Sequence, residues 1–354
     1  MKRIFILFVF TCILTSANSQ TIKEVTDYFG RGELEKAYTL SSELIKLDSL
    51  DKVAIHMHGR VLADLGKHHE AVPYLLKSIE LDCSKTEVTG WAHGVLGQCY
   101  FMLGKYKESE DALKKCIQLN STPNSVKYAE KRMFAYGFDK YFSKWTIVET
   151  EHIRFHIQKA DKYTNLEVFT KQREDAFVKI QNELGSQLPK KIDFFVWVDK
   201  KEPMKKFKMN LGFANPETAC IYSHSRQTVG HEITHVLSHY IGKNLSKTGL
   251  INEGIAVYFN MESGEKMDQL KKVMESKNYK NLKVMDFWYN FRDYNDEISY
   301  PFAGAFMEKL VKTYGIENLK PLLVNQTYES ALAIYGTSFK TVIEEFEKEV
   351  NQAL

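Results

Sequence analysis

The stretch with the most specific chemistry in this sequence is a pair of histidines four positions apart, with a glutamate beside the first. His231, Glu232 and His235 form the pattern H-E-x-x-H. Residues at positions i and i+4 lie on one face of a helix, so the two imidazoles can bind a single metal ion. Glu232 lies about 100° around the helix from His231, where its carboxylate can act on a water molecule at the metal. The pattern therefore predicts a hydrolytic zinc site on a helix.

A third ligand follows at a distance that suits a second helix. Glu253 lies 18 positions after His235. This interval allows the first helix to end, the chain to turn between Gly242 and Gly249, and a second helix to return antiparallel. Catalytic zinc sites use three protein ligands and keep a fourth position for water, and two histidines with one glutamate are a common set. We therefore expect Zn²⁺ to be bound by His231, His235 and Glu253.

These two segments resemble the gluzincin metallopeptidases, of the thermolysin-like and aminopeptidase-like group. In that family H-E-x-x-H is followed by a helix that carries Asn-Glu-Gly or Asn-Glu-Ala, and here the helix contains Asn252, Glu253 and Gly254. The interval is one residue shorter than in the aminopeptidase-like members. The resemblance implies hydrolysis of peptide bonds by zinc-activated water, with Glu232 as the general base and Asn252 supporting the ligands from behind.

Other assignments of the metal ligands are disfavoured. The zinc pattern H-E-x-x-H-x-x-G-x-x-H requires glycine and histidine where Ser238 and Ile241 stand. His239 continues the same helix face, but three imidazoles along one straight helix cannot close tetrahedrally on one ion, so we expect His239 to be solvated or to lie behind the ligands. A purely structural zinc site is disfavoured because such sites are usually closed and rich in cysteine.

A tyrosine further along the chain is a candidate for stabilising the oxyanion. The small residues in Ser299–Leu310 indicate a packed helix, and Pro301 suits its first turn. Related metallopeptidases have a tyrosine at the start of such a helix, and its phenol donates to the oxyanion. The resemblance therefore implies this catalytic role for Tyr300. The competing candidates are Tyr258, Tyr289 and Tyr294.

The region before the metal helix alternates between strand and helix patterns. We expect strands at 145–149, 152–157, 191–198 and 219–223, a helix at 164–184, and a loop at 207–215. This layout resembles the first half of gluzincin catalytic domains, in which the edge strand before H-E-x-x-H pairs with an extended substrate. His152 and His156 alternate with apolar residues and are expected to face solvent. Residues 212–217 match the amine-binding G-x-M-E-N motif poorly, so no amino-terminal specificity is expected.

The remainder of this half is predicted to be helical. Helices are expected at 265–277, 284–291, 299–310 and 337–350. The resemblance thus implies an α+β zinc metallopeptidase domain over 145–354, made of a small mixed sheet and a helical bundle.

The N-terminal part of the chain repeats itself. Similar six-residue segments begin at Gly32, Gly66 and Gly104, which are 34 and then 38 positions apart. The period resembles the tetratricopeptide repeat, in which each glycine lies at the turn between two helices. We expect an α-helical solenoid of about three repeats over 20–124 and a capping or linker helix over 125–144. The solenoid is either a scaffold or a binding surface for a protein or peptide partner.

The first 19 residues are typical of a secretory signal peptide. Lys2 and Arg3 precede the apolar run Ile4–Leu14, which is too short to span a bilayer and is followed by small residues. Cleavage is expected after Ser19 or, alternatively, after Ala17. We therefore expect an exported protein, periplasmic or extracellular, with no transmembrane segment in the mature chain.

Composition narrows the choice of partners. The formal net charge of +3 argues against nucleic acid as the main partner. Four cysteines follow the signal peptide: Cys83, Cys99, Cys116 and Cys220. They are too few for a dense disulfide framework, and the sequence leaves their pairing open. The histidines of the repeat region lack ligand spacing and are expected to be surface or packed residues; they are His56, His58, His68, His69 and His93.

The sequence thus predicts an exported zinc-dependent peptidase with a peptide or protein substrate and a repeat domain for protein interaction. The alternative is a catalytically inactive, peptidase-like binding or scaffold protein that acts through its repeats.

Overall fold

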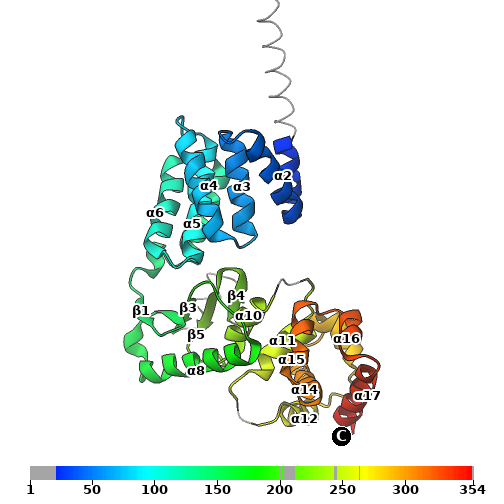
Figure 1. Ribbon diagram of the computed structural model, residues 1–354. Coiled ribbons are helices and arrows are strands. Elements are labelled where there is room, and N and C mark those ends of the chain that lie inside the picture. The colour runs from blue at the N-terminus through cyan, green and yellow to red at the C-terminus, as the bar shows by residue number, and fades with distance from the viewer. Residues whose placement is uncertain (1–20, 199–200, 202–211, 243–244, 263, 353–354) are drawn as a thin grey trace, which may run out of the picture. The chain divides into compact units, whose positions relative to one another are not determined.

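The computed structural model forms two compact units, Met1–Ser143 and Lys144–Leu354 (Figure 1). It describes residues 21–198, 201, 212–242, 245–262 and 264–352. The predicted signal peptide lies outside the described residues. Within those residues, no helix is long and apolar enough to cross a membrane.

The first unit is built from consecutive helices joined by short turns. Residues 21–30 are helical and are followed by α2 (Leu34–Leu47), α3 (Lys52–Asp64), α4 (His68–Leu81), α5 (Glu87–Met102), α6 (Tyr106–Leu119) and α7 (Pro123–Ala135). The repeated glycines lie at turns with positive φ: +73° at Gly32, +78° at Gly66 and +70° at Gly104. Glycine adopts this left-handed conformation without a steric penalty. The predicted turns between repeat helices are therefore confirmed.

The insertion that lengthens the second period is held by a buried carboxylate. Asp82 accepts hydrogen bonds from Lys52 Nζ at 2.6 Å and from the hydroxyl groups of Thr86 and Thr89 at 2.7 Å each. The backbone N–H groups of both threonines donate to the same carboxylate oxygen. The connection from α4 to α5 is therefore an ordered cap.

The helix after the repeats is shorter than the sequence predicts. We expected a helix over 125–144, but α7 begins at Pro123, with the hydroxyl of Thr122 accepting from Ser125 N at 3.1 Å. It ends at Ala135 because Gly137 follows with a φ of +79°, and a 3-10 turn (η1, Lys140–Phe142) comes next. The four cysteines after the signal are free thiols in the described structure.

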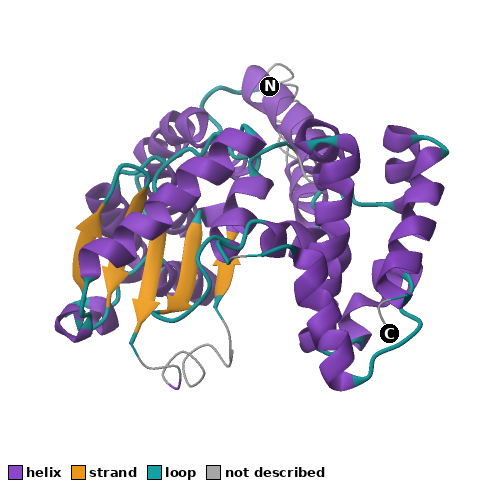
Figure 2. Cartoon of the chain, turned by 90° about the horizontal axis from the view of Figure 1, so that it is seen from below, coloured by secondary structure: helices purple, strands orange, loops and turns teal. Residues whose placement is uncertain are grey.

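Among the described residues, the second unit contains a mixed five-stranded sheet in the order β1-β2-β3-β5-β4 (Figure 2). The strands are β1 (Thr146–Glu149), β2 (Ile153–Ile157), β3 (Ile192–Trp197), β4 (Phe213–Asn215) and β5 (Cys220–His224). Strands β2, β3 and β5 are parallel, and the two edge strands β1 and β4 pair antiparallel with their neighbours. The predicted hairpin and the strands expected at 191–198 and 219–223 are confirmed.

The edge of the sheet nearest the metal helix differs from the expectation. The segment expected as a loop contains the short strand β4, and β5, expected to be the edge strand, lies between β3 and β4. Three residues followed by Pro216 are too few to show the alternation that predicts a strand. The edge strand is therefore β4.

His156 is a second correction. Its side chain is 4% exposed instead of facing solvent, because Nε2 lies 2.7 Å from Oδ1 of the buried Asp193 on the neighbouring strand. The ring also stacks on Phe195, with 4.2 Å between centroids. His152 is half-buried, stacks on Phe177 and pairs with Glu174 at 2.6 Å. Alternation located His156 on the face opposite Phe155, but that face is not solvated. His152 precedes the strand and packs against α8 (Leu166–Leu184), the helix that Phe155 also contacts.

The helices of the second unit pack around a large apolar core. They are α8 (Leu166–Leu184), α10 (His231–His239), α11 (Gly249–Tyr258), α12 (Lys266–Lys277), α13 (Val284–Asn290), α14 (Asp296–Tyr314), α15 (Ile316–Val324), α16 (Tyr328–Tyr335) and α17 (Ser338–Asn351). Apolar residues of β2, β3, β5, α8 and α10 pack together in this core. Two of the helices, α15 and α16, were not expected.

Helix α14 begins earlier than the sequence predicts. Asn295 caps it by accepting from Glu297 N at 2.9 Å, so the helix starts at Asp296. Pro301 therefore lies in the second turn rather than the first, and Tyr300 is the residue just before it.

Candidate metal centre

The first two candidate ligands are oriented by the start and the buried face of α10. Gly230, which precedes the helix, has a φ of +101°, and a Cβ there would lie 2.5 Å from the carbonyl oxygen of Phe259. Only glycine is compatible with both conditions. Ile233 and Val236 are buried in the core, so the opposite face of α10 carries His231 and His235 toward α11.

The third candidate ligand is oriented by close packing of α11 on α14. A Cβ on Gly254 would lie 2.5 Å from Met307 Cγ and 2.8 Å from the carbonyl oxygen of Ala303, both on α14. The glycine after Glu253 is therefore required by helix packing. The same close approach brings Tyr300, near the start of α14, to the wall of the site.

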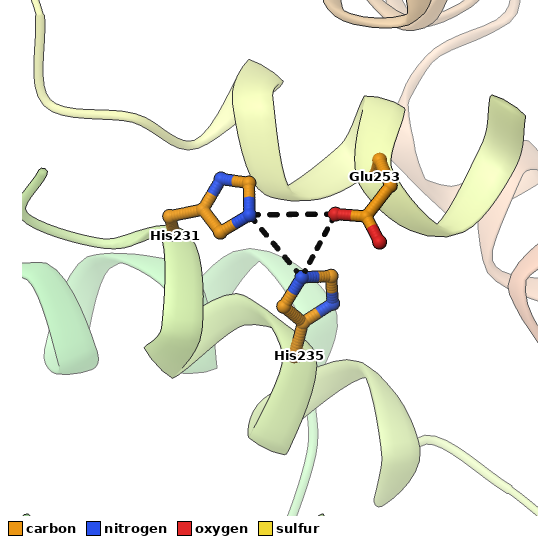
Figure 3. A group of neighbouring side chains, drawn as sticks. All are labelled: His231, His235 and Glu253. Atoms are coloured by element: carbon orange, nitrogen blue, oxygen red, sulfur yellow. Dashed lines mark hydrogen bonds and ion pairs between the residues drawn. The ribbon is translucent and has the colours of Figure 1, made fainter. Parts of the chain in front are cut away.

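The three predicted ligands converge (Figure 3). His231 Nε2 and His235 Nε2 lie 3.3 Å apart. Glu253 Oε2 lies 3.4 Å from the first nitrogen and 3.2 Å from the second. All three side chains are largely buried, with exposed fractions of 8–13%. Each donor atom therefore faces the same small region.

These separations agree with what a tetrahedral zinc site requires. With metal–ligand distances of about 2.0–2.1 Å and tetrahedral angles, two ligand atoms lie about 3.3–3.4 Å apart. The three measured separations of 3.2–3.4 Å match that edge length. Two imidazole nitrogens and one carboxylate oxygen are also a donor set that zinc favours. The described residues therefore suit zinc in both geometry and chemistry.

The charge of Glu253 also suits a ligand. Burial alone raises the pKa of a carboxyl group. For Glu253 this effect is outweighed by hydrogen bonds and charge interactions with His231 and His235, so its pKa lies well below the usual range. Glu253 therefore stays ionised over the physiological pH range.

Glu232 lies beside the ligands but is not part of their group. It is 5% exposed, and its Oε1 accepts a hydrogen bond from Gln227 Nε2 at 3.1 Å. Burial raises the pKa of Glu232 to about 7, and the charge of Glu253 adds to this shift. A carboxyl group with a pKa near neutrality can both accept and release a proton.

Asn252 lies behind His235, as the sequence predicts. Its side-chain amide is 3.3 Å from His235 Nδ1. A metal bound at Nε2 requires the ring proton on Nδ1, so a metal-bound His235 would donate to the amide oxygen of Asn252. This contact would fix both the tautomer and the ring orientation.

Tyr300 lines the same cavity, whereas the three competing tyrosines do not. Its ring stacks on His231 with 6.0 Å between centroids. Burial and, second, the charge of Glu253 raise the pKa of Tyr300 to about 12, so the phenol keeps its proton. The neighbouring Arg292 guanidinium acts against this rise in pKa and lines the cavity beside Tyr300. It is placed to donate a hydrogen bond.

Two residues of the site are missed by sequence reasoning. Arg292 Nη2 lies 3.2 Å from Glu253 Oε1, the carboxylate oxygen that faces away from the histidines. Gln227 contacts Glu232, as given above. Gln227 lies in the connection between β5 and α10, and Arg292 lies in a short 3-10 helix (η4, Phe291–Asp293) between α13 and α14. Neither residue belongs to a spaced motif, so no sequence signal identifies them.

The converging group excludes His239. This histidine lies at the end of α10, where its ring packs edge-on against Tyr240. A second acidic and histidine group, Glu151, His152 and Glu174, lies at the surface of the unit. His152 Nδ1 and Glu174 Oε1 lie 2.6 Å apart and Glu151 is exposed, so this group lacks the burial of the converging residues.

The candidate site opens into a cavity of about 800 Å³. Its wall includes Gly212, Phe213 and Ala214 of the β4 segment on one side and Tyr300 of α14 on another. Most of the other lining side chains are polar or charged, among them Lys247, Asn260, Glu262, Gln269 and Asp296. A ligand in this cavity would contact the edge strand and all three converging residues.

One part of the chain matches a known family. Residues 51–121 match the tetratricopeptide repeat family, a range that contains α3 to α6. Repeats of this family indicate protein–protein interaction. The chain therefore combines a tetratricopeptide-repeat region with a second unit of a small mixed sheet and helices. A search of the curated proteins gave no match to this chain.

Proposed function

We propose that this protein is an exported zinc-dependent peptidase of the gluzincin type, and that its repeats bind a protein partner or substrate. The observation that carries the proposal is the triangle of His231 Nε2, His235 Nε2 and Glu253 Oε2, with sides of 3.2–3.4 Å. The buried carboxylate of Glu232 lies beside it in an open cavity. This combination suits metal-assisted hydrolysis better than a closed structural site.

Each residue has a distinct task in this proposal. His231, His235 and Glu253 hold the zinc ion, and Asn252 fixes the His235 ring. When bound, zinc lowers the pKa of its water toward neutrality and polarises the substrate carbonyl. Glu232 accepts a proton from the attacking water and transfers it to the leaving amine.

Tyr300 completes the set. Its protonated phenol donates a hydrogen bond to the carbonyl oxygen as negative charge develops there. Arg292 holds the outer oxygen of Glu253 and lines the cavity beside Tyr300. Removing the phenol hydroxyl should therefore lower kcat more than it changes KM.

An extended peptide suits the cavity. Strand β4 is an edge strand whose residues Phe213 and Ala214 line the site. An extended peptide can add to such an edge through backbone hydrogen bonds, which are independent of its side chains. The proposal therefore includes peptide binding along β4.

The direct test compares wild type with Glu232→Gln on a proteome-derived peptide library. We expect Glu232→Gln to retain stoichiometric zinc and to lose about 10²–10⁴-fold in kcat, which is the usual contribution of general acid–base catalysis. The matched control is Glu344→Gln, at an exposed glutamate on α17. This control should cleave the library as wild type does.

Two results would contradict the proposal. Undiminished cleavage by Glu232→Gln would reject the assigned base. Purified protein that lacks stoichiometric zinc, with no effect of chelation on any activity, would favour a catalytically inactive binding or scaffold protein that acts through its repeats.

A further inference from the structure

Gln227 uses both ends of its side-chain amide in the wall of the cavity. Its Oε1 accepts a hydrogen bond from the backbone N–H of Gly212 at 3.0 Å. Its Nε2 donates to Glu232 Oε1 at 3.1 Å. Because a backbone N–H can only donate, the amide oxygen must face Gly212 and the NH₂ group must face Glu232. The polarity of this contact is therefore set by the backbone.

The surroundings of Gln227 leave its amide little freedom. Its backbone N–H donates to the carbonyl oxygen of His224 at 3.1 Å, and its carbonyl oxygen accepts from Nη2 of the buried Arg173 at 3.3 Å. A Cβ on Gly212 would lie 2.8–2.9 Å from the three amide atoms of Gln227. The Gln227 amide thus lies directly against the backbone of Gly212, with no room for a side chain between them.

Glu232 and the edge strand line the same cavity. Gly212, which donates to Gln227, directly precedes Phe213 and Ala214 of β4, and both strand residues line the cavity together with Glu232. The contact through Gln227 therefore links the Glu232 carboxylate to the start of β4.

We propose that Gln227 is a positioning residue that orients the Glu232 carboxylate from the start of β4. This inference rests on the proposed function. If a peptide pairs with β4, the strand that aligns the peptide backbone also aligns the base, so the scissile carbonyl and Glu232 keep a fixed relation. Misplacement of a catalytic group by about 1 Å can lower a rate by about 100-fold.

The test uses two substitutions of similar size. Gln227→Met removes both hydrogen bonds, whereas Gln227→Glu keeps the shape but replaces the donor with an acceptor that repels Glu232. We expect kcat to fall about tenfold in Gln227→Met and about 100-fold in Gln227→Glu, with KM and zinc affinity close to wild type. Gln172→Met and Gln172→Glu, at an exposed position on α8, are the matched controls and should leave both constants unchanged.

A role in packing alone predicts the opposite order, because glutamate preserves the shape of glutamine better than methionine does. Gln227→Glu that is as active as wild type, or more active than Gln227→Met, would therefore overturn the proposal. Equal loss of zinc in both variants would also overturn it, since the effect would then lie on the ligands.

A second readout does not depend on turnover. Crystal structures of zinc-free wild type and Gln227→Met should show the Glu232 carboxylate rotated away from β4 in the variant. An unchanged carboxylate would reject the inference even if activity falls. If wild type cleaves no peptide, the proposed function fails, and these structures still decide the role of Gln227.

Gly212→Ala tests the same contact from the other partner. The added methyl group must displace the Gln227 amide, so this variant should also lose about tenfold in kcat and show a rotated Glu232. If Gln227→Met does not fold, Gly212→Ala still tests the contact between Gly212 and Gln227. Normal kcat and an unmoved carboxylate in Gly212→Ala would contradict the proposal.

Discussion

At the scale of single residues, the site combines candidate metal ligands with side chains that orient them. Asn252 contacts His235 and Arg292 holds Glu253, so these two residues orient candidate metal ligands, whereas Gln227 contacts the candidate base Glu232. Such outer contacts fix the orientation and basicity of metal ligands. The chemistry assigned to the motif therefore depends on residues outside it.

Arg292 provides a prediction at this scale. Its guanidinium holds Glu253 Oε1 at 3.2 Å, which leaves Oε2 to face the histidines. We expect Arg292→Met to weaken zinc affinity by about tenfold, at the low end for residues behind metal ligands because the arginine side chain is 70% exposed. Competition with a fluorescent zinc chelator measures this directly. Arg226→Met, at an exposed arginine in the same unit, is the control. Equal zinc affinity in wild type and Arg292→Met would show that the contact is incidental.

At the scale of elements, the site depends on how closely α11 and α14 approach. Gly254 faces Met307 and the carbonyl oxygen of Ala303, while Gly304 faces Val257 in return. Two glycines thus remove side chains from the same helix interface. Glu253 and Tyr300 are brought to one cavity because these helices pack nearly backbone to backbone.

Gly254→Ala tests this packing. The added methyl group would lie 2.5 Å from Met307 Cγ and 2.8 Å from a backbone oxygen, which cannot move freely. Overpacking of this kind typically costs about 1–3 kcal/mol. We expect a lower Tm for the second unit and a lower kcat, because α14 carries Tyr300. Gly30→Ala, where a Cβ meets nothing within 4 Å, is the control. A normal Tm and kcat in Gly254→Ala would contradict the packing account.

The elements also show what sequence reasoning can and cannot supply. The turns at Gly32, Gly66 and Gly104 were predictable because a period repeats a local conformation that glycine favours. The converging ligands were predictable because helical spacing determines which side chains share a face. Strand β4 was not, because three residues carry no period.

The wrong prediction that His156 faces solvent has a different cause. Alternation gives the face of a strand but not what lies on that face, and here Asp193 on the next strand provides a buried partner. Gln227 and Arg292 were missed for the same reason. Their partners are determined by tertiary contacts across 5 to 39 positions, which no local pattern encodes.

At the scale of the whole molecule, the chain has two units with separate cores. A ligand stabilises only the unit that binds it, by an amount that grows with the ratio of ligand concentration to Kd. We therefore expect zinc at 100 Kd to stabilise the second unit by about 2.7 kcal/mol, which raises its Tm. The Tm of the first unit should not change. Calorimetry with and without chelator measures both transitions. A zinc-dependent shift of the repeat unit would contradict the assignment of the site.

The stability of the first unit should depend on pH. Burial lowers the pKa of His56 to about 3 and that of His68 to about 4. In the unfolded chain both histidines titrate near 6.5. Since the folded pKa values are depressed, their stabilising contribution is complete above pH 6.5 and is lost as the pH falls below it. Between pH 7 and 5 each histidine should reduce the stability of the first unit by about 2 kcal/mol.

Urea unfolding at pH 7, 6 and 5 measures the predicted loss of stability. Hydrogen exchange of α3 to α5 distinguishes unfolding of the first unit from unfolding of the second. Because the protons bind only to the unfolded chain, replacing the two buried histidines by leucine should flatten the dependence on pH. His69→Leu, at an exposed neighbour of His68, should retain the full dependence. A first unit whose stability is the same at pH 7 and pH 5 would show that these histidines can take up protons without unfolding.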